Sequence, residues 1–398
     1  MSYCGNHVGK SNIRSQRERH SDNARPFASI LIVELHMKLL GIDLFAGAGG
    51  MSLGASLAGI QVAVAVENDK NASVTYAFNH SGTRILNQDI RRVSRNDINP
   101  LSNGRDATIL FGGPPCQGFS YSNQKTRTKE NPENWLFLEF LRIARTCRPD
   151  WVVFENVRGI SDTQGGMFLD KVETGLQKLN YSLSKGILNA SDFGVPQNRA
   201  RLFIVGSPRG ARFRFPEPNR HKTVTVGEAI SDLPILENGA SNPLMRYSTE
   251  AHSEYAKLMR GRMQQSPNHF VTNNAPHIIE RYRHIPEGGN WENIPAKLMK
   301  NYKNRKKCHT GIYHRLRENS PSIVIGNYRK NMVVHPREHR GLSVREAARI
   351  QSFPDWYEFF GSIGFQQQQV GNAVPPFLAK AVFTSILKEI GALPPAKT

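Results

Sequence analysis

The chain has 398 residues, enough for one large domain or two smaller domains with sizeable cores. Its formal net charge is +19, and a globular protein this basic usually binds a polyanion, most often nucleic acid, although a basic face that meets only solvent is the alternative. The four cysteines have no CxxC spacing, which argues against a zinc site or a disulfide framework and fits a reducing cytoplasm. No apolar run approaches the roughly 20 residues of a membrane span.

Residues 1–36 are polar and rich in turn-forming residues. We expect a poorly ordered extension there, since such a segment has little apolar surface to bury. We also expect a chain that begins at Met37 to keep its folding and activity.

The first predicted core strand, Leu39–Asp43, runs into a glycine-rich turn at 44–50 and a helix from about Met51. Strand, glycine turn and helix open a nucleotide-binding βαβ unit. Ser52 stands where the third glycine of G-x-G-x-x-G belongs, so this is not the dinucleotide fingerprint. The glycines still allow a ligand to approach the backbone closely.

Two further strands are predicted at 61–66 and 84–86. Glu67 ends the first of them, where an acid is placed to accept hydrogen bonds from two ribose hydroxyls. Stabilisation of the next helix by this acid is the alternative, and both roles are compatible. Asp89 and Ile90 follow the second of these strands.

A stiff turn at 112–120 (GGPPCQGFS) follows the predicted buried strand 107–111. Two glycines let the backbone leave the strand sharply, and two prolines then fix it without a backbone N–H to donate. Cys116 is therefore held just past the carboxyl end of a strand. A buried, inert cysteine is the alternative.

Residues 121–133 are polar and predict a mobile loop that closes over a bound strand, with a plain solvated loop as the alternative. A helix is predicted from Trp135 to Thr146, with a buried face that includes Leu138, Leu141, Ile143 and Ala144.

The next strand, 151–154, ends in Glu155-Asn156-Val157. Asp43, Glu67, Cys116 and Glu155 then all lie at or past the carboxyl ends of predicted parallel strands, which is the edge where open α/β sheets bind ligands. A lone capping acid is the alternative reading of Glu155.

A strand at 181–188 precedes Gln197-Asn198-Arg199-Ala200-Arg201 and a strand at 202–205. Alternation along an extended segment predicts that Gln197, Arg199 and Arg201 share one face. Two guanidiniums fixed on one face suit a polar base edge and a phosphate. Surface arginines at a strand start are the alternative.

From about 216 to 335 the periodicity weakens and basic residues cluster, most densely at 300–307. We predict a second, irregular domain that faces nucleic acid with Lys and Arg on phosphates. Ser343 and Glu346 then form a capping box at the start of a helix that Pro354 stops, which we interpret as structural support. A last helix has Leu378, Val382, Ile386 and Ile390 on one side.

Together these motifs resemble those of the cytosine carbon-5 DNA methyltransferase family of bacterial restriction-modification type, over roughly residues 37–390. The resemblance rests on the D-x-F-x-G-x-G loop at 43–49, the turn around Cys116, Glu155-Asn156-Val157 and Q-x-R-x-R at 197–201. It implies an α/β fold with a doubly wound, mostly parallel sheet of the S-adenosylmethionine-dependent methyltransferase type. A smaller, irregular target-recognition domain is inserted in it.

The implied division is an extension (1–36), the first part of the catalytic and cofactor-binding domain (37–215), the target-recognition domain (216–335), and a return to the catalytic domain (336–398). The last segment then lies beside the first strand. The chain would be a DNA (cytosine-5-)-methyltransferase that uses S-adenosyl-L-methionine and no metal.

The resemblance also assigns roles to residues. The catalytic residues would be Cys116, Glu155, Arg199 and Arg201. The cofactor-binding residues would be Phe45, Ala46, Gly47, Gly49, Gly50, Glu67, Asn68, Asp89, Ile90, Pro114, Asn372 and Ala373. The substrate-binding residues would be Gln117, Ser120, Asn156 and Gln197.

The expected chemistry begins with addition of the Cys116 thiolate to carbon 6 of a flipped cytosine. Glu155, protonated or sharing a proton with ring nitrogen 3, would take up the charge on the ring. Arg201 is the candidate that favours the thiolate. The base that removes the carbon-5 proton stays unassigned, and water is a candidate.

The expected partner is double-stranded DNA, with a cognate restriction endonuclease acting independently, no membrane and a monomeric, cytoplasmic enzyme that joins the nucleoid when bound to DNA. A tRNA cytosine-5 methyltransferase on the same scaffold is the nearest alternative. A nicotinamide-dependent oxidoreductase is disfavoured by Ser52. A catalytically inert DNA-binding module is disfavoured by the full set Cys116, Glu155, Arg199 and Arg201.

Overall fold

The computed structural model describes residues 39–98, 107–115, 132–161, 163–211, 213–219, 223–300, 302, 310–326 and 328–391. The predictions for the N-terminal extension, for Cys116, Gln117, Ser120 and the loop after them, and for most of the basic cluster at 300–307 lie outside these residues.

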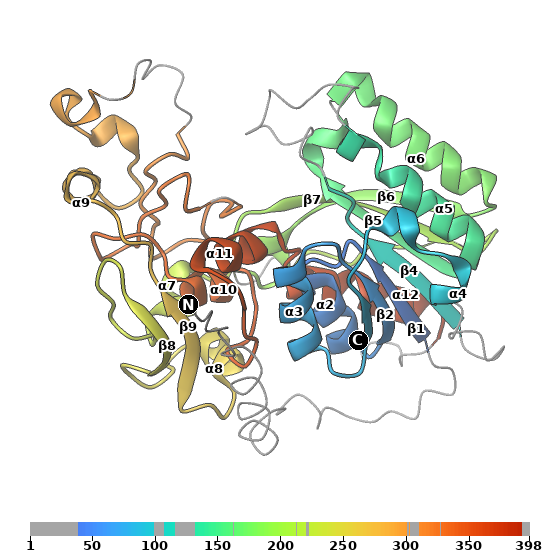
Figure 1. The fold of residues 1–398 in the computed structure, drawn as a ribbon, viewed down its shortest axis with the longest axis horizontal. Coiled ribbons are helices and arrows are strands. Elements are labelled where there is room, and N and C mark those ends of the chain that lie inside the picture. Colours follow the sequence, from blue (N-terminus) through green and yellow to red (C-terminus); the bar gives the residue numbers. More distant parts are fainter. Residues whose placement is uncertain are drawn as a thin grey trace, which may run out of the picture.

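A seven-stranded sheet forms one half of the molecule, in the order β3-β2-β1-β4-β5-β7-β6 (Figure 1). The parallel strands are β1 (Leu39–Leu44), β2 (Gln61–Val66), β3 (Arg84–Leu86), β4 (Ala107–Gly112) and β5 (Trp151–Val157). The last hairpin, β6 (Ser182–Asn189) and β7 (Ala200–Ser207), places β7 antiparallel to β5. Because the strand order reverses between β1 and β4, their carboxyl ends mark the switch point where such sheets bind ligands.

Helices cover both faces of this sheet, as the predicted fold class requires. The helices that follow β1, β2 and β3 are α2 (Gly50–Ala58), α3 (Lys70–Asn79) and α4 (Arg95–Ile98). One face packs against α5 (Phe137–Cys147) and α6 (Met167–Lys178), and the other against α2 and α12 (Pro376–Glu389). The last helix therefore lies beside β1, as predicted: Leu378, Val382 and Ile386 are buried in one core with Leu39.

The helix predicted at 135–146 begins two residues later than expected, after a 3-10 turn (Pro132–Trp135). Its buried face consists of Phe137, Phe140, Ile143 and Ala144. Leu138 is 45% exposed, so its predicted burial was wrong. The apolar positions at i, i+3, i+6 and i+7, counted from Phe137, set the face that meets the sheet, and Leu138 lies beside that stripe.

The other half of the molecule contains a two-stranded antiparallel sheet and short helices (Figure 1). The strands are β8 (Ser241–Arg246) and β9 (Gln265–Phe270), and the helices are α7 (Val226–Ile230), α8 (Glu254–Arg260), α9 (Pro276–Arg283), α10 (Val344–Ile350) and α11 (Ile363–Asn372). The remaining 3-10 turns are Ile90–Arg92, Arg158–Ser161, Thr163–Gly166, Ala190–Phe193, Trp291–Asn293 and Ala296–Met299.

One core of this half joins elements on both sides of the predicted boundary at residue 335. Val226 of α7 and Tyr255 of α8 pack with Val344 of α10 and Val370 of α11, and with Leu53 of α2. The two halves therefore share one apolar core. The predicted domain limits at 215/216 and 335/336 stay a prediction.

Helix α10 lies at the centre of this shared core, and its seven residues are all buried. The predicted capping box is present, with the Ser343 hydroxyl accepting from the Glu346 N–H and the Glu346 carboxylate accepting from the Ser343 N–H. The helix ends at Ile350, so Pro354 marks the turn beyond it rather than its last residue. The structural role predicted for this segment is confirmed by its burial.

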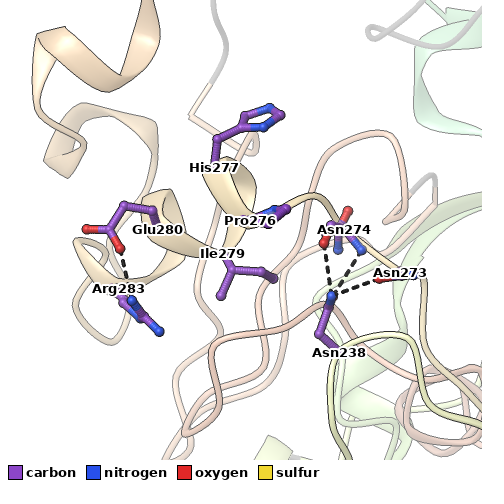
Figure 2. A pocket seen from close by; sticks show the side chains of 8 residues that line it. All are labelled: Asn238, Asn273, Asn274, Pro276, His277, Ile279, Glu280 and Arg283. Carbon is purple, nitrogen blue, oxygen red and sulfur yellow. Dashed lines mark hydrogen bonds and ion pairs between the residues drawn. The ribbon is translucent and has the colours of Figure 1, made fainter.

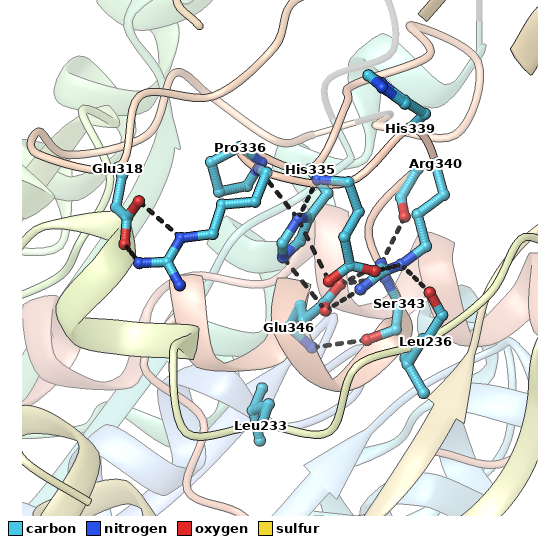
Figure 3. A network of polar contacts seen from close by, with 12 residues as sticks. Leu233, Leu236, Glu318, His335, Pro336, His339, Arg340, Ser343 and Glu346 are labelled. Atoms are coloured by element: carbon cyan, nitrogen blue, oxygen red, sulfur yellow. Dashed lines mark hydrogen bonds and ion pairs between the residues drawn. The ribbon is translucent and has the colours of Figure 1, made fainter. Parts of the chain in front are cut away.

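Buried ion pairs attach α10 to its surroundings. Arg340 donates to both carboxylate oxygens of Glu346 (Figure 3). It also donates to Glu338. Burial alone would raise the pKa of Glu346, but the Arg340 guanidinium outweighs it and lowers that pKa to about 2. At the other end of the helix, its penultimate residue Arg349 donates to Asp232 and Asp355.

The glutamine run at 366–369 is part of α11, and three of its residues are buried. By length and composition alone, the helical stretch Ile363–Glu389 could cross a membrane, and it is the one such stretch among the residues described. It consists of two helices broken at Ala373–Pro375, and 67% of its apolar window is buried inside the protein. Burial of this kind is the behaviour of core helices.

Candidate active site

The glycine loop, residues 45–50, leaves β1 at the carboxyl edge of the sheet. It has a strained backbone, with positive φ at Phe45 (60°), Gly47 (54°) and Gly49 (89°). A Cβ on Gly50 would lie 2.3 Å from the Val374 carbonyl oxygen, whereas a Cβ on Gly47 would meet nothing within 4 Å. One side of the loop is thus packed against the protein and the other leaves its backbone open to a ligand.

Glu67 supports this loop from the end of β2. Its Oε2 accepts from the Gly47 N–H at 2.7 Å and its Oε1 from the Asp69 N–H at 2.6 Å. Burial raises the pKa of Glu67. Each carboxylate oxygen keeps a second lone pair, so ribose hydroxyls remain possible donors to it. Asn68, predicted beside it, is exposed.

Asp89 and Ile90 follow β3 as predicted, but the Asp89 carboxylate already caps a 3-10 turn. It accepts from the Arg91 backbone N–H, and its hydrogen bonds to Arg91 lower its pKa. The Ile90 side chain is 5% exposed and is buried in the core between the sheet and helices α5 and α6.

The end of α11 brings the C-terminal motif to the glycine loop. Ala373 packs on Gly50, since a Cβ built there would lie 3.3 Å from the Ala373 methyl carbon. Asn372, the last residue of α11, is exposed. The fold thus places residues 50 and 373 side by side, and the lining of a cofactor pocket by Asn372 and Ala373 stays a prediction.

Glu155 lies against the turn that leads to Cys116. A Cβ on Gly113 would lie 2.5 Å from the Glu155 Oε2, and the Asn156 amide donates to the Pro114 carbonyl oxygen at 3.4 Å. Arg201 approaches from β7, with its Nε 3.0 Å from the Glu155 Oε1. Burial raises the pKa of Glu155, while the charges of Arg201 and Arg199 act against that rise.

Arg199 connects the entry to β7 with the end of α11. Its Nη2 donates to the carbonyl oxygens of Gly371 and Ala373, both at 3.0 Å. Its Nε and Nη1 are buried and have no partner among the described residues. Burial and the neighbouring Arg201 lower its pKa. Two donor atoms of Arg199 are therefore left unsatisfied inside the protein, and its charge acts on the Glu155 carboxyl.

Gln197 departs from the predicted pattern. The charges of Arg199 and Arg201 both act on Glu155, whereas the buried Gln197 amide donates to Gln351 at 3.1 Å and accepts from the Ile325 N–H at 3.2 Å. Gln197 therefore joins the entry to β7 to α10 and to the segment around residue 325. Both ends of its amide make contacts within the chain, and its role as a substrate contact stays a prediction.

Sequence reasoning missed a buried polar chain behind the glycine loop. The Ser52 hydroxyl donates to Asp43 Oδ2 at 2.6 Å and lies 2.7 Å from the Tyr76 hydroxyl. Burial raises the pKa of Asp43 to about 8. The signal available in the sequence was Ser52 itself, a small polar residue where other nucleotide loops have glycine.

A separate hollow of about 650 Å³ lies along α9 and the loops at 238 and 273–274 (Figure 2). The Asn238 amide donates to Asn273 and to the Asn274 backbone, so these asparagines hold the two loops together. The hollow belongs to the irregular half and not to the carboxyl edge of the sheet. Among the residues described, no group of three His, Cys, Asp or Glu side chains is placed to hold a metal ion.

The sheet order, the glycine loop and the acid after β2 define the α/β fold of S-adenosylmethionine-dependent methyltransferases. The structure of a putative DNA modification methyltransferase encoded within an E. coli prophage has the same fold, with a TM-score of 0.73 and 24% identity over 89% of this chain and all of that one. The family model for C-5 cytosine-specific DNA methylase matches residues 39–388, and the chain belongs to this family.

Curated relatives agree with this assignment. The chain is 36% identical to the type II methyltransferase M1.HphI of Haemophilus parahaemolyticus, over 88% of this chain and 87% of that protein. It is 32% identical to the type II methyltransferase M.DdeI of Desulfomicrobium norvegicum, over 86% of each. The activity of the chain is therefore that of a DNA cytosine-5 methyltransferase.

Proposed function

We propose that this chain uses S-adenosyl-L-methionine to methylate carbon 5 of a cytosine flipped out of duplex DNA, as the modification enzyme of a type II restriction-modification system. The observation that carries the proposal is the contact of the buried Glu155 carboxyl, held by Arg201, with the turn at 113–114. Cys116 lies two residues after Pro114 in the sequence.

The residues around the glycine loop fit the cofactor. The cofactor can approach the backbone closely at Gly47, where a Cβ would meet no other atom within 4 Å. The Glu67 carboxylate oxygens can accept hydrogen bonds from the ribose hydroxyls. Phe45, Ala46, Gly49, Gly50, Asn68, Asp89, Ile90, Pro114, Asn372 and Ala373 complete the proposed binding set. When bound, the cofactor supplies an electrophilic methyl group on a sulfonium.

The chemistry of the chain then follows from Cys116 and Glu155. The Cys116 thiolate adds to carbon 6, and the electrons displaced from the ring meet a proton shared between ring nitrogen 3 and the Glu155 carboxyl. Carbon 5 takes the methyl group as the ring electrons return. A base then removes the carbon-5 proton, the bond to Cys116 breaks, and the thiolate leaves. Burial of Glu155 favours the protonated carboxyl that this step needs.

Arg199 and Arg201 act around this carboxyl. Arg201 fixes its orientation through the 3.0 Å contact. The two unpaired donors of Arg199 are suited to an acceptor on the flipped base or its phosphate. Asn156, Gln117 and Ser120 complete the proposed base pocket, and the irregular half supplies contacts to the surrounding duplex.

The test is covalent trapping on DNA that contains 5-fluorocytosine, because fluorine at carbon 5 cannot leave as a proton and the thiol adduct persists. We expect the wild-type chain to form the adduct and Cys116→Ser to lose it while still binding S-adenosylhomocysteine. Cys147→Ser, which alters a cysteine of helix α5, is the matched control and should still be trapped. Loss of both the adduct and cofactor binding in Cys116→Ser would contradict the assignment.

Substrate class and target site are tested in parallel. Unmodified duplex DNA should accept methyl groups, whereas a tRNA transcript should not. Methylation-sensitive sequencing of DNA from a host that expresses the chain should show one short modified sequence, as expected for a type II system. A monomer that acts independently of its endonuclease should be sufficient for this modification.

A further inference from the structure

We propose that Tyr357 and His80 are positioning residues for the glycine loop, through which the irregular half of the protein sets the affinity for the cofactor. Neither residue reaches the ligand in this proposal; both act on the backbone that the ligand meets. The inference rests on the proposed cofactor site. The supporting residue Tyr357 lies about 300 residues from the glycine loop in the sequence.

The first observation is the contact made by the Tyr357 hydroxyl. It donates to the Ala48 carbonyl oxygen, in the middle of the glycine loop. His80 Nε2 lies 3.0 Å from the same hydroxyl. A tyrosine hydroxyl has one proton to donate, and here it is donated to the Ala48 carbonyl oxygen. The Tyr357 oxygen is therefore the acceptor toward His80, and the His80 Nε2 is the donor. Burial lowers the pKa of His80 to about 4, so the ring is neutral near pH 7.

The second observation is that the loop needs external support. Positive φ at Phe45 is uncommon for a residue with a side chain, and such backbone persists only where surrounding contacts fix it. Glu67 holds the Gly47 N–H on one side and Tyr357 holds the Ala48 carbonyl on the other. A Cβ on Gly49 would lie 2.5 Å from His80 Nε2, so the pair also fits closely under that glycine.

The third observation is how Tyr357 is itself held. Arg345 of α10 donates to the Tyr357 carbonyl oxygen at 2.6 Å and to the Pro267 carbonyl oxygen of β9 at 2.9 Å. Asn79 of α3 bonds the next residue, Glu358, through both its N–H and its carbonyl. Strand β9, Arg345, Tyr357 and the glycine loop therefore form one continuous series of contacts.

The test is Tyr357→Phe, which keeps the ring and removes the hydroxyl. Tyr255→Phe is the matched control, because the Tyr255 hydroxyl is buried in the same core but donates to the Arg349 carbonyl oxygen at 2.5 Å, away from the loop. Affinity for S-adenosylhomocysteine is measured by calorimetry, DNA affinity without cofactor by fluorescence anisotropy, and protection of amides 46–50 by hydrogen exchange.

We expect Tyr357→Phe to bind S-adenosylhomocysteine about 5- to 30-fold more weakly, since an unpaired buried carbonyl and histidine are left behind. Its amides at 46–50 should exchange faster, while DNA affinity stays within about 2-fold of wild type and the KM for the cofactor rises more than kcat falls. Tyr255→Phe should change neither cofactor affinity nor loop exchange.

Equal cofactor affinity and equal loop protection in the wild type and both variants would overturn the inference. Equal losses in the two variants would also overturn it, since they would reflect general destabilisation of the shared core. A wild-type chain that does not bind S-adenosylhomocysteine would instead overturn the proposed cofactor, and the hydrogen-exchange comparison would still test the support of the loop.

Discussion

The protonation state of the Glu155 carboxyl is set by two opposing effects on its pKa. Removal from water favours the neutral acid, and Arg201 at 3.0 Å favours the anion. The net result is a raised pKa, so the acid holds a proton to higher pH than it would in water. A group of this kind can supply a proton to a ring nitrogen and recover it.

Glu155→Gln should lower kcat by about 10²- to 10³-fold, the usual effect of losing one group that stabilises developing charge. Cofactor affinity should be retained. In the wild type kcat should fall as the pH rises through the raised pKa of Glu155, and this limb should be absent from the variant. Glu254→Gln, in an exposed pair with Lys257, is the control for both measurements. Unchanged kcat in Glu155→Gln would remove Glu155 from the mechanism.

Asp43 offers a stability test at the same scale. Its pKa is 3.8 in the unfolded chain and about 8 in the folded protein, so the folded state holds the proton more tightly. Its contribution to stability is therefore full below pH about 4 and is lost as the pH rises through about 8. Asp43→Asn should flatten the decline in the free energy of unfolding between about pH 5 and pH 8, measured by urea denaturation. Parallel pH profiles for the two proteins would contradict the buried, protonated Asp43.

At the scale of elements, the end of α11 is fixed by close backbone contact. A Cβ on Gly371 would lie 1.8 Å from the Gly326 carbonyl oxygen, a distance that no side-chain rotation relieves. The same residue presents its carbonyl oxygen to Arg199. The position of the helix and the position of the guanidinium are thus set together.

Gly371→Ala should cost about 1–3 kcal/mol of stability, because the backbone of α11 or of the segment at 326 must shift. The midpoint of urea denaturation should fall without a change in slope. Gly82→Ala is the control, since a Cβ there meets nothing within 4 Å, and its effect should stay within about 0.5 kcal/mol. Equal midpoints for the two variants would disprove the close approach.

Helix α10 provides a second test at this scale, through a buried cation between two acids. Arg349→Met leaves Asp232 and Asp355 buried without their partner, and we expect a loss of about 3–5 kcal/mol. Lys257→Met removes an exposed pair with Glu254 and should cost less than about 1 kcal/mol. Thermal and chemical denaturation would both measure the difference, and a small loss in Arg349→Met would show that the acids are neutralised in another way.

At the scale of the whole molecule, the net charge of +19 predicts how binding responds to salt. If the protein contacts 6–10 phosphates, DNA affinity should fall by about 10³- to 10⁵-fold between about 50 and 200 mM salt. Affinity for S-adenosylhomocysteine, measured over the same range, should change little. A flat salt response for DNA would mean that the positive charge lies away from the DNA-binding surface.

The sequence by itself determined the elements whose signal is local. The strands of the large sheet appeared as short apolar runs, the glycine loop as a turn that glycine-rich backbone adopts, and the start of α10 as a capping box between Ser343 and Glu346. Glu67 and Glu155 were found because the carboxyl ends of parallel strands converge on one edge. Each of these inferences needs only neighbouring residues and a general rule of packing.

Only the tertiary structure decided which distant residues meet. Leu138 is exposed because the neighbouring phenylalanines of α5 pack against the sheet instead. The Gln197 amide bonds to the end of α10 and to the segment at 325. Tyr357 supports the glycine loop near the other end of the chain. These contacts join residues up to 309 positions apart. No periodicity or spacing encodes such a contact, because it depends on how whole elements are placed in space.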